Sequence, residues 1–282
     1  MRFVKMHGLG NDFVVLDGWR EPLPEAPGTL ARRICDRHFG VGADGLVLIG
    51  PSRQADVGMR IFNPDGSEAE MCGNAIRCVA RYVHERAYVT GDRIRVETPA
   101  GVMEPRLVLR GGRVAAVRVD MGKPRLERGE IPMEGPPGRV VEEPLEVAGS
   151  TLRLTAVSMG NPHAVLFVDD VQEIDLLALG PALENHPVFP RRTNVEFVQV
   201  LGPRAVRVRV WERGAGATLA CGTGACAAVV AGVITGRTAR EVTVHLPGGD
   251  LEVAWAADGQ VYLTGPAEEV FEGKLKGLED KL

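Results

Sequence analysis

The 282-residue sequence has no apolar run that approaches the ~20 residues of a membrane-spanning helix. It also lacks the apolar stretch of a signal peptide, because its first residues, MRFVKMHGLGND, soon become polar and glycine-rich. A basic excess is missing as well: the formal net charge is −4, whereas nucleic-acid-binding surfaces are usually rich in lysine and arginine. We therefore expect a cytoplasmic protein that binds neither membrane nor nucleic acid.

The five cysteines form no C-x-x-C pair, which excludes the usual redox motif. Their odd number, without a secretion signal, argues against a disulfide framework. Zinc ligands are usually two to four residues apart, whereas Cys72 and Cys78 are six apart and Cys221 and Cys226 are five apart. We therefore expect no metal site. The G-x-x-x-x-G-K-[ST] pattern of a phosphate cradle is absent too.

What is present is the composition of a globular protein, 45% hydrophobic and 25% charged, with a length that predicts two domains. An internal repeat supports the division. RIFNPDGSEAEMCG at 60–73 resembles RVWERGAGATLACG at 209–222, at an offset of 149. GNDFVVLD at 10–17 resembles GNPHAVLFVD at 160–169, at an offset of 150. Two matches at nearly one offset, in the same order, predict a duplicated chain with two lobes.

The repeat defines which residues of the two lobes are equivalent. The pairs are Asn11 and Asn161, Arg60 and Arg209, Phe62 and Trp211, Cys72 and Cys221, and Gly73 and Gly222. We expect an N-terminal lobe over residues 1–117, to which residues 269–282 return, and a C-terminal lobe over residues 118–268. Each lobe then carries one cysteine of the repeat.

Hydrophobic patterning predicts an α/β protein of the α+β type, in which each lobe wraps many short strands around one central helix. Asn74–Glu85 has one apolar face, and Gly224–Ile234 is apolar all round, so it should be buried on every side. Pro124–Pro144, rich in Pro, Gly and Glu, predicts a surface loop. The predicted strands are 13–16, 46–49, 59–62, 96–98, 114–119, 164–168, 195–200, 206–211, 242–246 and 261–264.

Cys72 and Cys221 each precede a glycine at a predicted helix start. The free N–H groups and partial positive charge at a helix N-terminus favour a thiolate over a thiol. The same N–H groups can bind a carboxylate, because glycine leaves them uncovered. Two such thiols suit the inversion of a carbon that bears a hydrogen, since one base removes a proton from one face while an acid delivers a proton to the other. We interpret Cys35, Cys78 and Cys226 as inert packing instead.

Several segments resemble diaminopimelate epimerase. They are HGLGNDFVVLD at 7–17, NPDGSEAEMCGNAIRC at 63–78, GNPHAVLFV at 160–168, WERGAGATLACGTGAC at 211–226 and TGPAEEVFEG at 264–273. The resemblance covers most of the chain and is weakest at 104–156. It implies two pseudo-symmetric lobes, each a β-barrel-like mixed sheet around a central helix. It further implies a homodimer that uses no cofactor and interconverts LL- and meso-diaminopimelate in lysine and peptidoglycan precursor biosynthesis.

The resemblance also implies roles for individual residues. Cys72 and Cys221 would be the acid/base pair, assisted by His163 and Glu212. The substrate would contact Asn11, Asn63, Gly73, Asn74, Asn161, Asn194, Glu212, Arg213, Gly222 and Thr223. Arg213 suits the distal carboxylate of this substrate, because a guanidinium can bind a carboxylate through two hydrogen bonds.

Plainer interpretations stay open for some of these residues. His163 could be a turn residue after Pro162, and Glu212 with Arg213 could form a solvated ion pair at a strand end. Gly45 departs from the family pattern, because many relatives carry a substrate-contacting glutamine at this position. We therefore expect no such contact from Gly45.

Two other functions remain possible. One is a proline or hydroxyproline racemase of the same superfamily, whose substrate has no distal amino-acid end. The other is a two-lobed small-molecule binding protein with incidental thiols. Comparing the turnover of diaminopimelate with that of proline distinguishes an epimerase from a racemase. Exchange of the substrate's α-hydrogen with solvent distinguishes an enzyme from a binding protein, because binding alone cannot produce it.

Overall fold

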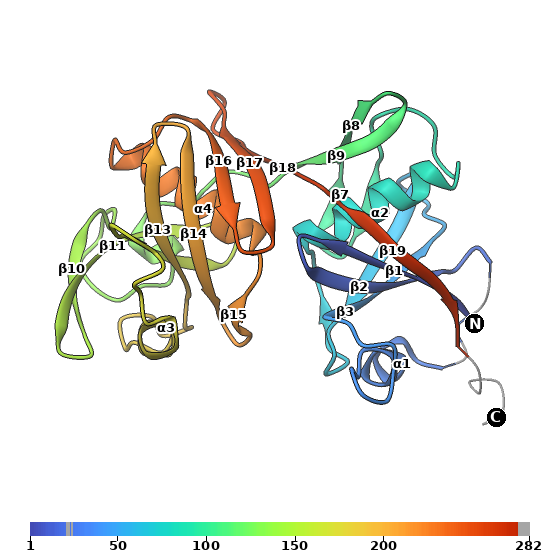
Figure 1. Ribbon diagram of the computed structural model, residues 1–282, viewed down its shortest axis with the longest axis horizontal. Coiled ribbons are helices and arrows are strands. Elements are labelled where there is room, and N and C mark those ends of the chain that lie inside the picture. Colours follow the sequence, from blue (N-terminus) through green and yellow to red (C-terminus); the bar gives the residue numbers. More distant parts are fainter. Residues whose placement is uncertain (21–22, 24, 276–282) are drawn as a thin grey trace. The chain divides into compact units, whose positions relative to one another are not determined.

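The computed structural model describes residues 1–20, 23 and 25–275, which divide into two compact units (Figure 1). The first unit comprises residues 1–119 and 265–282, and the second comprises residues 120–264. Residues 276–282, which belong to the segment expected to return to the first lobe, lie outside the described residues.

The first unit is built from short strands and two helices. Its helices are α1 (Pro27–Ile34) and α2 (Gly73–Glu85). Its strands are β1 (Arg2–Gly8), β2 (Asn11–Asp17), β3 (Gly45–Gly50), β4 (Val57–Phe62), β5 (Glu68–Ala69), β6 (Val96–Thr98), β7 (Gly101–Met103), β8 (Arg106–Arg110), β9 (Arg113–Asp120) and β19 (Glu268–Lys274).

The second unit has the same plan. Its helices are α3 (Leu176–Glu184), α4 (Gly222–Ile234) and the single 3-10 turn η1 (Arg128–Glu130). Its strands are β10 (Glu143–Val147), β11 (Ser150–Ser158), β12 (Pro162–Phe167), β13 (Asn194–Gly202), β14 (Ala205–Glu212), β15 (Gly216–Thr218), β16 (Glu241–Leu246), β17 (Gly249–Trp255) and β18 (Val261–Gly265).

The order of the strands shows the duplication. In the first unit the order is β19-β1-β2-β3-β4-β6-β7, with β5 beside β4, and in the second it is β10-β11-β12-β13-β14-β16-β17-β18, with β15 beside β14. β2 and β3 are parallel, as are β12 and β13, and β4 and β6 are parallel, as are β14 and β16. The two units therefore share one strand order, as the repeat in the sequence predicts, and each contains the mixed sheet that the resemblance implies.

Both predicted helices are present. α4 contacts β11, β12, β13, β14, β16 and β17, and each residue from Gly224 to Gly232 is buried. That burial explains why its sequence is apolar on all sides. α2 packs against β1 and β4. Its polar residues Arg81, His84 and Glu85 are partly or fully exposed. A sheet that wraps one central helix is thus the arrangement in each unit.

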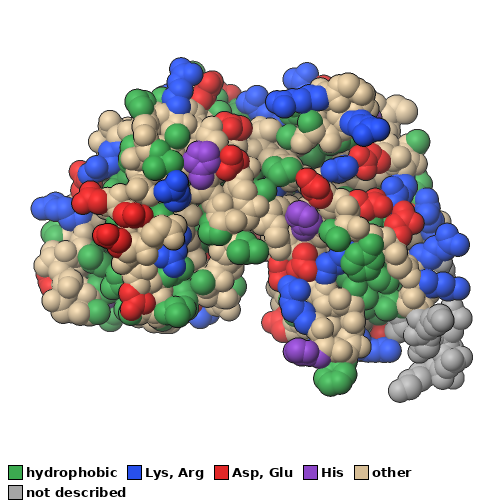
Figure 2. All heavy atoms as spheres, in the orientation of Figure 1, with side chains coloured by type: hydrophobic (Ala, Val, Ile, Leu, Met, Phe, Trp, Pro, Cys, Tyr) green, Lys and Arg blue, Asp and Glu red, His purple; other side chains and the backbone are tan. Residues whose placement is uncertain are grey.

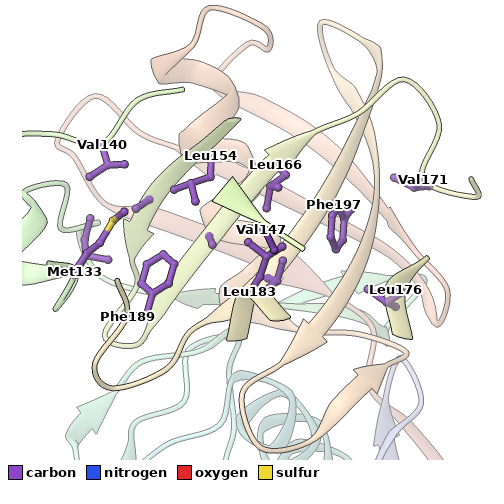
Figure 3. Packing of buried hydrophobic residues seen from close by; sticks show 14 residues of the cluster. Met133, Val140, Val147, Leu154, Leu166, Val171, Leu176, Leu183, Phe189 and Phe197 are labelled. Carbon is purple, nitrogen blue, oxygen red and sulfur yellow. The ribbon is translucent and has the colours of Figure 1, made fainter. Parts of the chain in front are cut away.

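A separate hydrophobic core stabilises each unit. In the first, Phe3, Leu16, Leu30 and Phe62 belong to one buried cluster. In the second, side chains from η1 onward to β13 converge, among them Leu154, Leu166, Leu183, Phe189 and Phe197 (Figure 3). Each core forms within its own unit, as expected for a duplicated fold.

The prediction of a surface loop at 124–144 is wrong in one respect. The segment is irregular apart from η1 and the first two residues of β10, but Ile131, Met133 and Val140 are buried in the core of the second unit. Arg128 is buried as well and donates to the Glu134 carbonyl at 3.0 Å. Single apolar residues between Pro and Gly create no periodic pattern, so the sequence gives no sign of their burial.

The surface is mixed in charge. Figure 2 shows acidic and basic side chains interspersed over the face in view of both units. None of the helices within the described ranges combines the length and the apolar character needed to cross a bilayer.

Candidate active site

Cys72 and Cys221 occupy the same structural position in their two units. Each is the residue immediately before a helix, with extended backbone angles, and Gly73 or Gly222 is the first helical residue. A helix leaves its first backbone N–H groups without intrahelical partners. Each cysteine therefore stands beside a set of free backbone donors.

Around Cys72, two asparagines form the first cysteine cluster (Asn11, Cys72 and Asn74). Asn11 Nδ2 donates to Asp44 Oδ2 at 2.9 Å, which turns Asn11 Oδ1 toward Asn74 Nδ2 at 2.9 Å and Cys72 Sγ at 3.9 Å. Asn74 Oδ1 is buried and has no partner among the described residues. The cluster therefore presents neutral amides to the thiol, one of them with an unused acceptor.

Charged residues behind this cluster fix Asn11 in place. Asp12, the next residue, accepts from Lys5 and, at 2.9 Å, from Arg37 Nη2. Burial raises the pKa of Asp12, but the hydrogen bonds from Arg37 and Lys5 outweigh it and lower that pKa to about 2. Arg37 also donates to Asp44 at 2.7 Å, so the partner of Asn11 is held by the same network.

The second cysteine cluster (Asn161, His163, Glu196, Glu212, Cys221 and Thr223) is richer in titratable groups. Cys221 Sγ accepts from the Gly224 N–H at 3.4 Å and lies 3.5 Å from Thr223 Oγ1. Burial, followed by the negative charges of Glu212 and Glu196, raises the pKa of Cys221 well above its usual value. The expectation that the helix N-terminus favours a thiolate is therefore wrong for Cys221 in this structure.

Glu212 ends β14 and lies beside Cys221. Its Oε1 accepts from Thr218 Oγ1 at 2.6 Å, and burial raises its pKa. The equivalent residue of the first unit is Asn63, at the end of β4, which is exposed and donates to Ser67 Oγ at 2.9 Å within its own turn. The two clusters thus differ in charge, although the backbone around them is duplicated.

His163 is not a turn residue, because it lies in β12 and is completely buried. Its Nδ1 is 2.7 Å from Glu196 Oε1, and its Nε2 is 3.0 Å from Asn161 Oδ1. Sequence reasoning missed Glu196. The signal was available, since a lone glutamate interrupts the apolar run of the strand at 195–200.

Arg213 is exposed and follows β14 directly. Its backbone N–H donates to Asn194 Oδ1 at 2.9 Å, and its Nη1 donates to the Arg191 carbonyl at 3.1 Å. Asn194 is buried and also donates to the Pro162 carbonyl at 2.9 Å. The alternative of an ion pair between Glu212 and Arg213 is therefore wrong, because each side chain has a different partner.

A buried carboxylate of α3 fixes the same turn. Glu184 Oε2 accepts from Trp211 Nε1 at 2.7 Å, and Glu184 Oε1 accepts from the Gly214 N–H at 2.9 Å. The residues on either side of Glu212 and Arg213, namely Trp211 and Gly214, are thereby both hydrogen-bonded to Glu184. Glu184 has no signature in the sequence, because α3 shows no polar pattern that separates it from a surface residue.

Gly45 begins β3 and is buried. A Cβ atom at this position would lie 3.2 Å from the Phe62 carbonyl oxygen and 3.3 Å from Phe13 Cδ1. A side chain such as glutamine would fit only if these neighbours moved slightly.

The structure thus brings the predicted residues together in two groups. Asn11 and Asn74 gather around Cys72, while Asn161, His163, Glu212 and Thr223 gather around or connect to Cys221. Cys35, Cys78 and Cys226 are buried, as expected for packing residues. Within the described ranges, no group of three or more His, Cys, Asp or Glu side chains is placed to hold a metal ion.

Comparison with known proteins gives consistent matches. Residues 3–127 and 155–270 match the family described as diaminopimelate epimerase. The chain is 66% identical over 275 residues to a diaminopimelate epimerase of Pelotomaculum thermopropionicum, covering 97% of this chain and 98% of that one. It is 62% identical to that of Moorella thermoacetica, with 97% and 98% covered.

Among solved structures, a probable proline racemase from Agrobacterium radiobacter has a similar fold. The TM-score is 0.70 at 17% identity, and the match covers 99% of this chain and 94% of that one. At this identity the similarity concerns the fold alone.

Proposed function

The chain belongs to the diaminopimelate epimerase family, and from this premise we propose that it interconverts LL- and meso-2,6-diaminopimelate by a two-base exchange of one α-hydrogen. The observation that carries the proposal is the equivalent placement of Cys72 and Cys221. Each precedes a glycine at the start of the central helix of its unit. A duplicated fold supplies two acid/base groups of the same kind, which inversion of one carbon requires.

In the proposed reaction, one sulfur acts as thiolate and takes the α-hydrogen as a proton, leaving the electron pair on the α-carbon. The other sulfur, as thiol, delivers its own proton to the opposite face, so the overall change is inversion without gain or loss of atoms. The substrate's α-carboxylate takes up negative charge while the α-carbon is deprotonated. The N–H groups of Gly73, Asn74, Gly222 and Thr223 are suited to bind that carboxylate.

His163 and Glu212 assist the cysteines. Burial raises the pKa of Glu212, which stands beside the Cys221 thiol, so Glu212 is suited to exchange a proton with that sulfur. The raised pKa of Cys221 suits a group that is a protonated thiol, and therefore an acid, before substrate binds. Cys72 Sγ lies 3.9 Å from the neutral amide oxygen of Asn11.

The remaining polar residues define the substrate. Diaminopimelate has a second amino-acid end, which needs a cation for its carboxylate and acceptors for its ammonium group. Arg213 supplies the cation, while Asn11, Asn63, Asn161 and Asn194 supply amide donors and acceptors. Arg213 is suited to this role because its backbone is fixed by Asn194 while its guanidinium remains exposed.

One incubation tests the reaction. Purified protein is mixed with LL-diaminopimelate in D₂O. The isomers are then separated by chiral chromatography, and their deuterium content is measured by mass spectrometry. We expect meso-diaminopimelate with one deuterium at the inverted carbon. No deuterium in either isomer would contradict the proposal, and turnover of proline in place of diaminopimelate would favour the racemase alternative.

We further propose that the enzyme is a cytoplasmic homodimer that acts without a cofactor in lysine and peptidoglycan precursor biosynthesis. The family membership supports each of these statements. Sedimentation of the purified protein tests the dimer.

A further inference from the structure

Thr218 carries a hydroxyl to which the proposed roles above assign no part. It lies on β15, the short strand that pairs with the end of β14, and its Oγ1 donates to Glu212 Oε1 at 2.6 Å. A hydroxyl that donates to an ionised carboxylate forms a short bond of about 2.5–2.7 Å. The distance therefore fits a Thr218 hydroxyl that stabilises the negative charge of Glu212.

The pairing of the two strands places this hydroxyl beside Glu212. Val210 lies opposite Thr218, and Glu212 lies opposite Gly216. Glu212 is two residues beyond Val210, so its side chain and that of Thr218 stand on the same face of the sheet as diagonal neighbours. Because Gly216 has no side chain, the position directly opposite Glu212 offers no competing group. The register thus brings Thr218 to the carboxylate.

The first unit repeats this pair of strands without the hydroxyl and without the carboxylate. β4 and β5 pair in the same register as β14 and β15. At the offset of 149, Ala69 stands in the place of Thr218, and Asn63 stands in the place of Glu212. Asn63 donates to Ser67 Oγ within its own turn instead. Pairing of the strands therefore does not account for Thr218, whose hydroxyl occurs in the unit that has the carboxylate.

Opposing effects act on the ionisation of Glu212. Burial is the largest and raises the pKa of Glu212, and the negative charge of Glu196 raises it further. Hydrogen bonds from Thr218 and Cys221 lower the same pKa, because both stabilise the charged form. The Thr218 hydroxyl keeps its proton across the ordinary pH range, whereas Cys221 is itself titratable. Thr218 is therefore the constant part of this stabilisation, and without it burial would be less opposed.

We propose that Thr218 is a positioning residue for Glu212: its hydroxyl holds Oε1 and favours the carboxylate form, which can accept the proton of the Cys221 thiol. In that step the S–H bond breaks, the proton forms an O–H bond on Glu212, and the electron pair stays on sulfur as a thiolate. The inference rests on the proposed function for its purpose, because this exchange matters only if Cys221 acts on substrate. The hydrogen bond from Thr218 is independent of turnover.

Titration of Glu212 tests the proposal directly. In protein labelled with ¹³C-glutamate, NMR follows the ionisation of the carboxyl carbons, and the Glu212 signal is the one that Glu212→Gln removes. Thr218→Val keeps the shape of the side chain and removes the hydroxyl. We expect the Glu212 midpoint to rise by about one pH unit in Thr218→Val, a tenfold change in the acid dissociation constant. Thr218→Ser keeps a hydroxyl and should keep the wild-type midpoint.

The other groups around Glu212 stay as they are in these variants. The charged and titratable ones are Arg213 in the same turn, Glu184 on α3, Glu196 on β13, His163 on β12 and Cys221 before α4. An unchanged or lower midpoint in Thr218→Val would overturn the proposal. If Thr218→Val fails to fold, Thr218→Ala provides the same test, because it also removes the hydroxyl and matches Ala69 of the first unit.

The pH dependence of turnover separates this role from a purely structural one. A reaction that needs the Glu212 carboxylate is lost as the pH falls through the pKa of that group. Because Thr218→Val should raise this pKa, the acidic limb of kcat/KM for LL-diaminopimelate should move to higher pH by the same interval. On that limb kcat/KM should be about tenfold below the wild-type value, and the two should converge at higher pH. An equal loss at every pH would show that Thr218 serves only the fold.

The matched control is Thr243→Val on β16 of the same unit. Thr243 Oγ1 donates to Glu252 Oε1 at 2.9 Å across a strand pair, and Glu252 is exposed. This variant loses a hydrogen bond of the same kind that involves none of the proposed site residues, so the Glu212 midpoint and the pH profile should stay unchanged. If the wild-type protein fails to exchange deuterium into diaminopimelate, the proposed function is wrong, whereas the NMR titration still decides the role of Thr218.

Discussion

At the scale of single residues, the proposed reaction depends on the two cysteines. Replacing either Cys72 or Cys221 with alanine should lower kcat for conversion of LL- to meso-diaminopimelate by about 10²–10⁴-fold, the usual contribution of a positioned acid or base. Serine should be nearly as damaging, because a hydroxyl is a much weaker acid than a thiol. Chiral chromatography of the products measures the rate.

Cys35→Ala is the control for this pair. Burial raises the pKa of Cys35 to about 11, so its thiol is unreactive near neutral pH. The variant should turn over at the wild-type rate. A wild-type rate in either Cys72→Ala or Cys221→Ala would exclude the two-base scheme.

Arg213 should determine which substrate is accepted. Lysine keeps the positive charge but loses the planar pair of donors, so Arg213→Lys should raise KM strongly. The fall in kcat/KM should correspond to a loss of about 2–5 kcal/mol in transition-state stabilisation. A lower kcat should accompany it, because binding at the distal end helps to orient the reacting carbon. Steady-state kinetics with LL-diaminopimelate test this.

Arg191→Lys is the matched control, since Arg191 is exposed and contributes only its backbone carbonyl to Arg213. It should behave like the wild type. An unchanged kcat/KM in Arg213→Lys would remove the distal-carboxylate role.

At the scale of secondary-structure elements, α3 holds the end of β14 in place. Gly180 allows close packing there, because a Cβ atom at this position would lie only 2.5 Å from the ring of Trp211. Gly180→Ala should therefore destabilise the protein by about 1–3 kcal/mol, the usual cost of overpacking. It should also raise KM, since the turn that contains Arg213 would shift. Urea unfolding and kinetics on one preparation measure both effects.

Gly202→Ala provides the comparison for this substitution. Gly202 ends β13, and a Cβ atom there would meet no other atom within 4 Å. We expect almost no change in stability or KM. Equal urea midpoints for Gly180→Ala and Gly202→Ala would mean that α3 does not restrain Trp211.

Asp12 connects β1, β2 and the segment after α1 in a pH-dependent way. Its folded pKa, about 2, is below the ordinary 3.8. Its contribution to stability is therefore fully present above about pH 4 and is lost as the pH falls toward 2. Asp12→Asn should destabilise the protein by about 1 kcal/mol at pH 7, after allowance for solvent screening, and by almost nothing near pH 2.

Urea unfolding at the two pH values tests this, with the exposed Asp169→Asn as control at both. A deficit in Asp12→Asn that is equal at both pH values would show that ionisation of Asp12 does not stabilise the fold.

At the scale of the whole molecule, the proposed reaction needs one sulfur from each unit at the same α-carbon. Without substrate, the two sulfurs should therefore be able to reach each other and form a disulfide under oxidising conditions. Oxidation should abolish turnover, and a reductant should restore it. Peptide mapping of the inactive protein should identify a bond between Cys72 and Cys221.

Cys78 should take no part in this bond, because burial raises its pKa to about 12. Cys35→Ala should respond to oxidation as the wild type does. A bond between any other two cysteines, or full activity with the Cys72–Cys221 bond intact, would contradict the proposed reaction geometry.

Much of the fold could be predicted from the sequence. The two-lobed plan follows from the repeat at offsets of 149 and 150, and α2 and α4 follow from their apolar periodicity. Strands such as β3 and β16 follow from short apolar or alternating runs. These features depend on local patterns, which are present in the sequence itself. The strand β1, which reads RFVKMHG, was missed because Lys5 and His7 break its alternation, although Lys5 is buried through its partners.

The sequence by itself determined the duplication, the position of each cysteine before a helix, and the family. Only the tertiary structure decided the chemical surroundings of those cysteines. Glu196, Glu212 and Cys221 belong to three different elements, β13, the end of β14 and the start of α4. The effect of burial and like charge on a pKa depends on distances between such elements, which no local pattern contains. The helix N-terminus alone predicts a thiolate at Cys221, whereas burial beside two carboxylates favours the thiol.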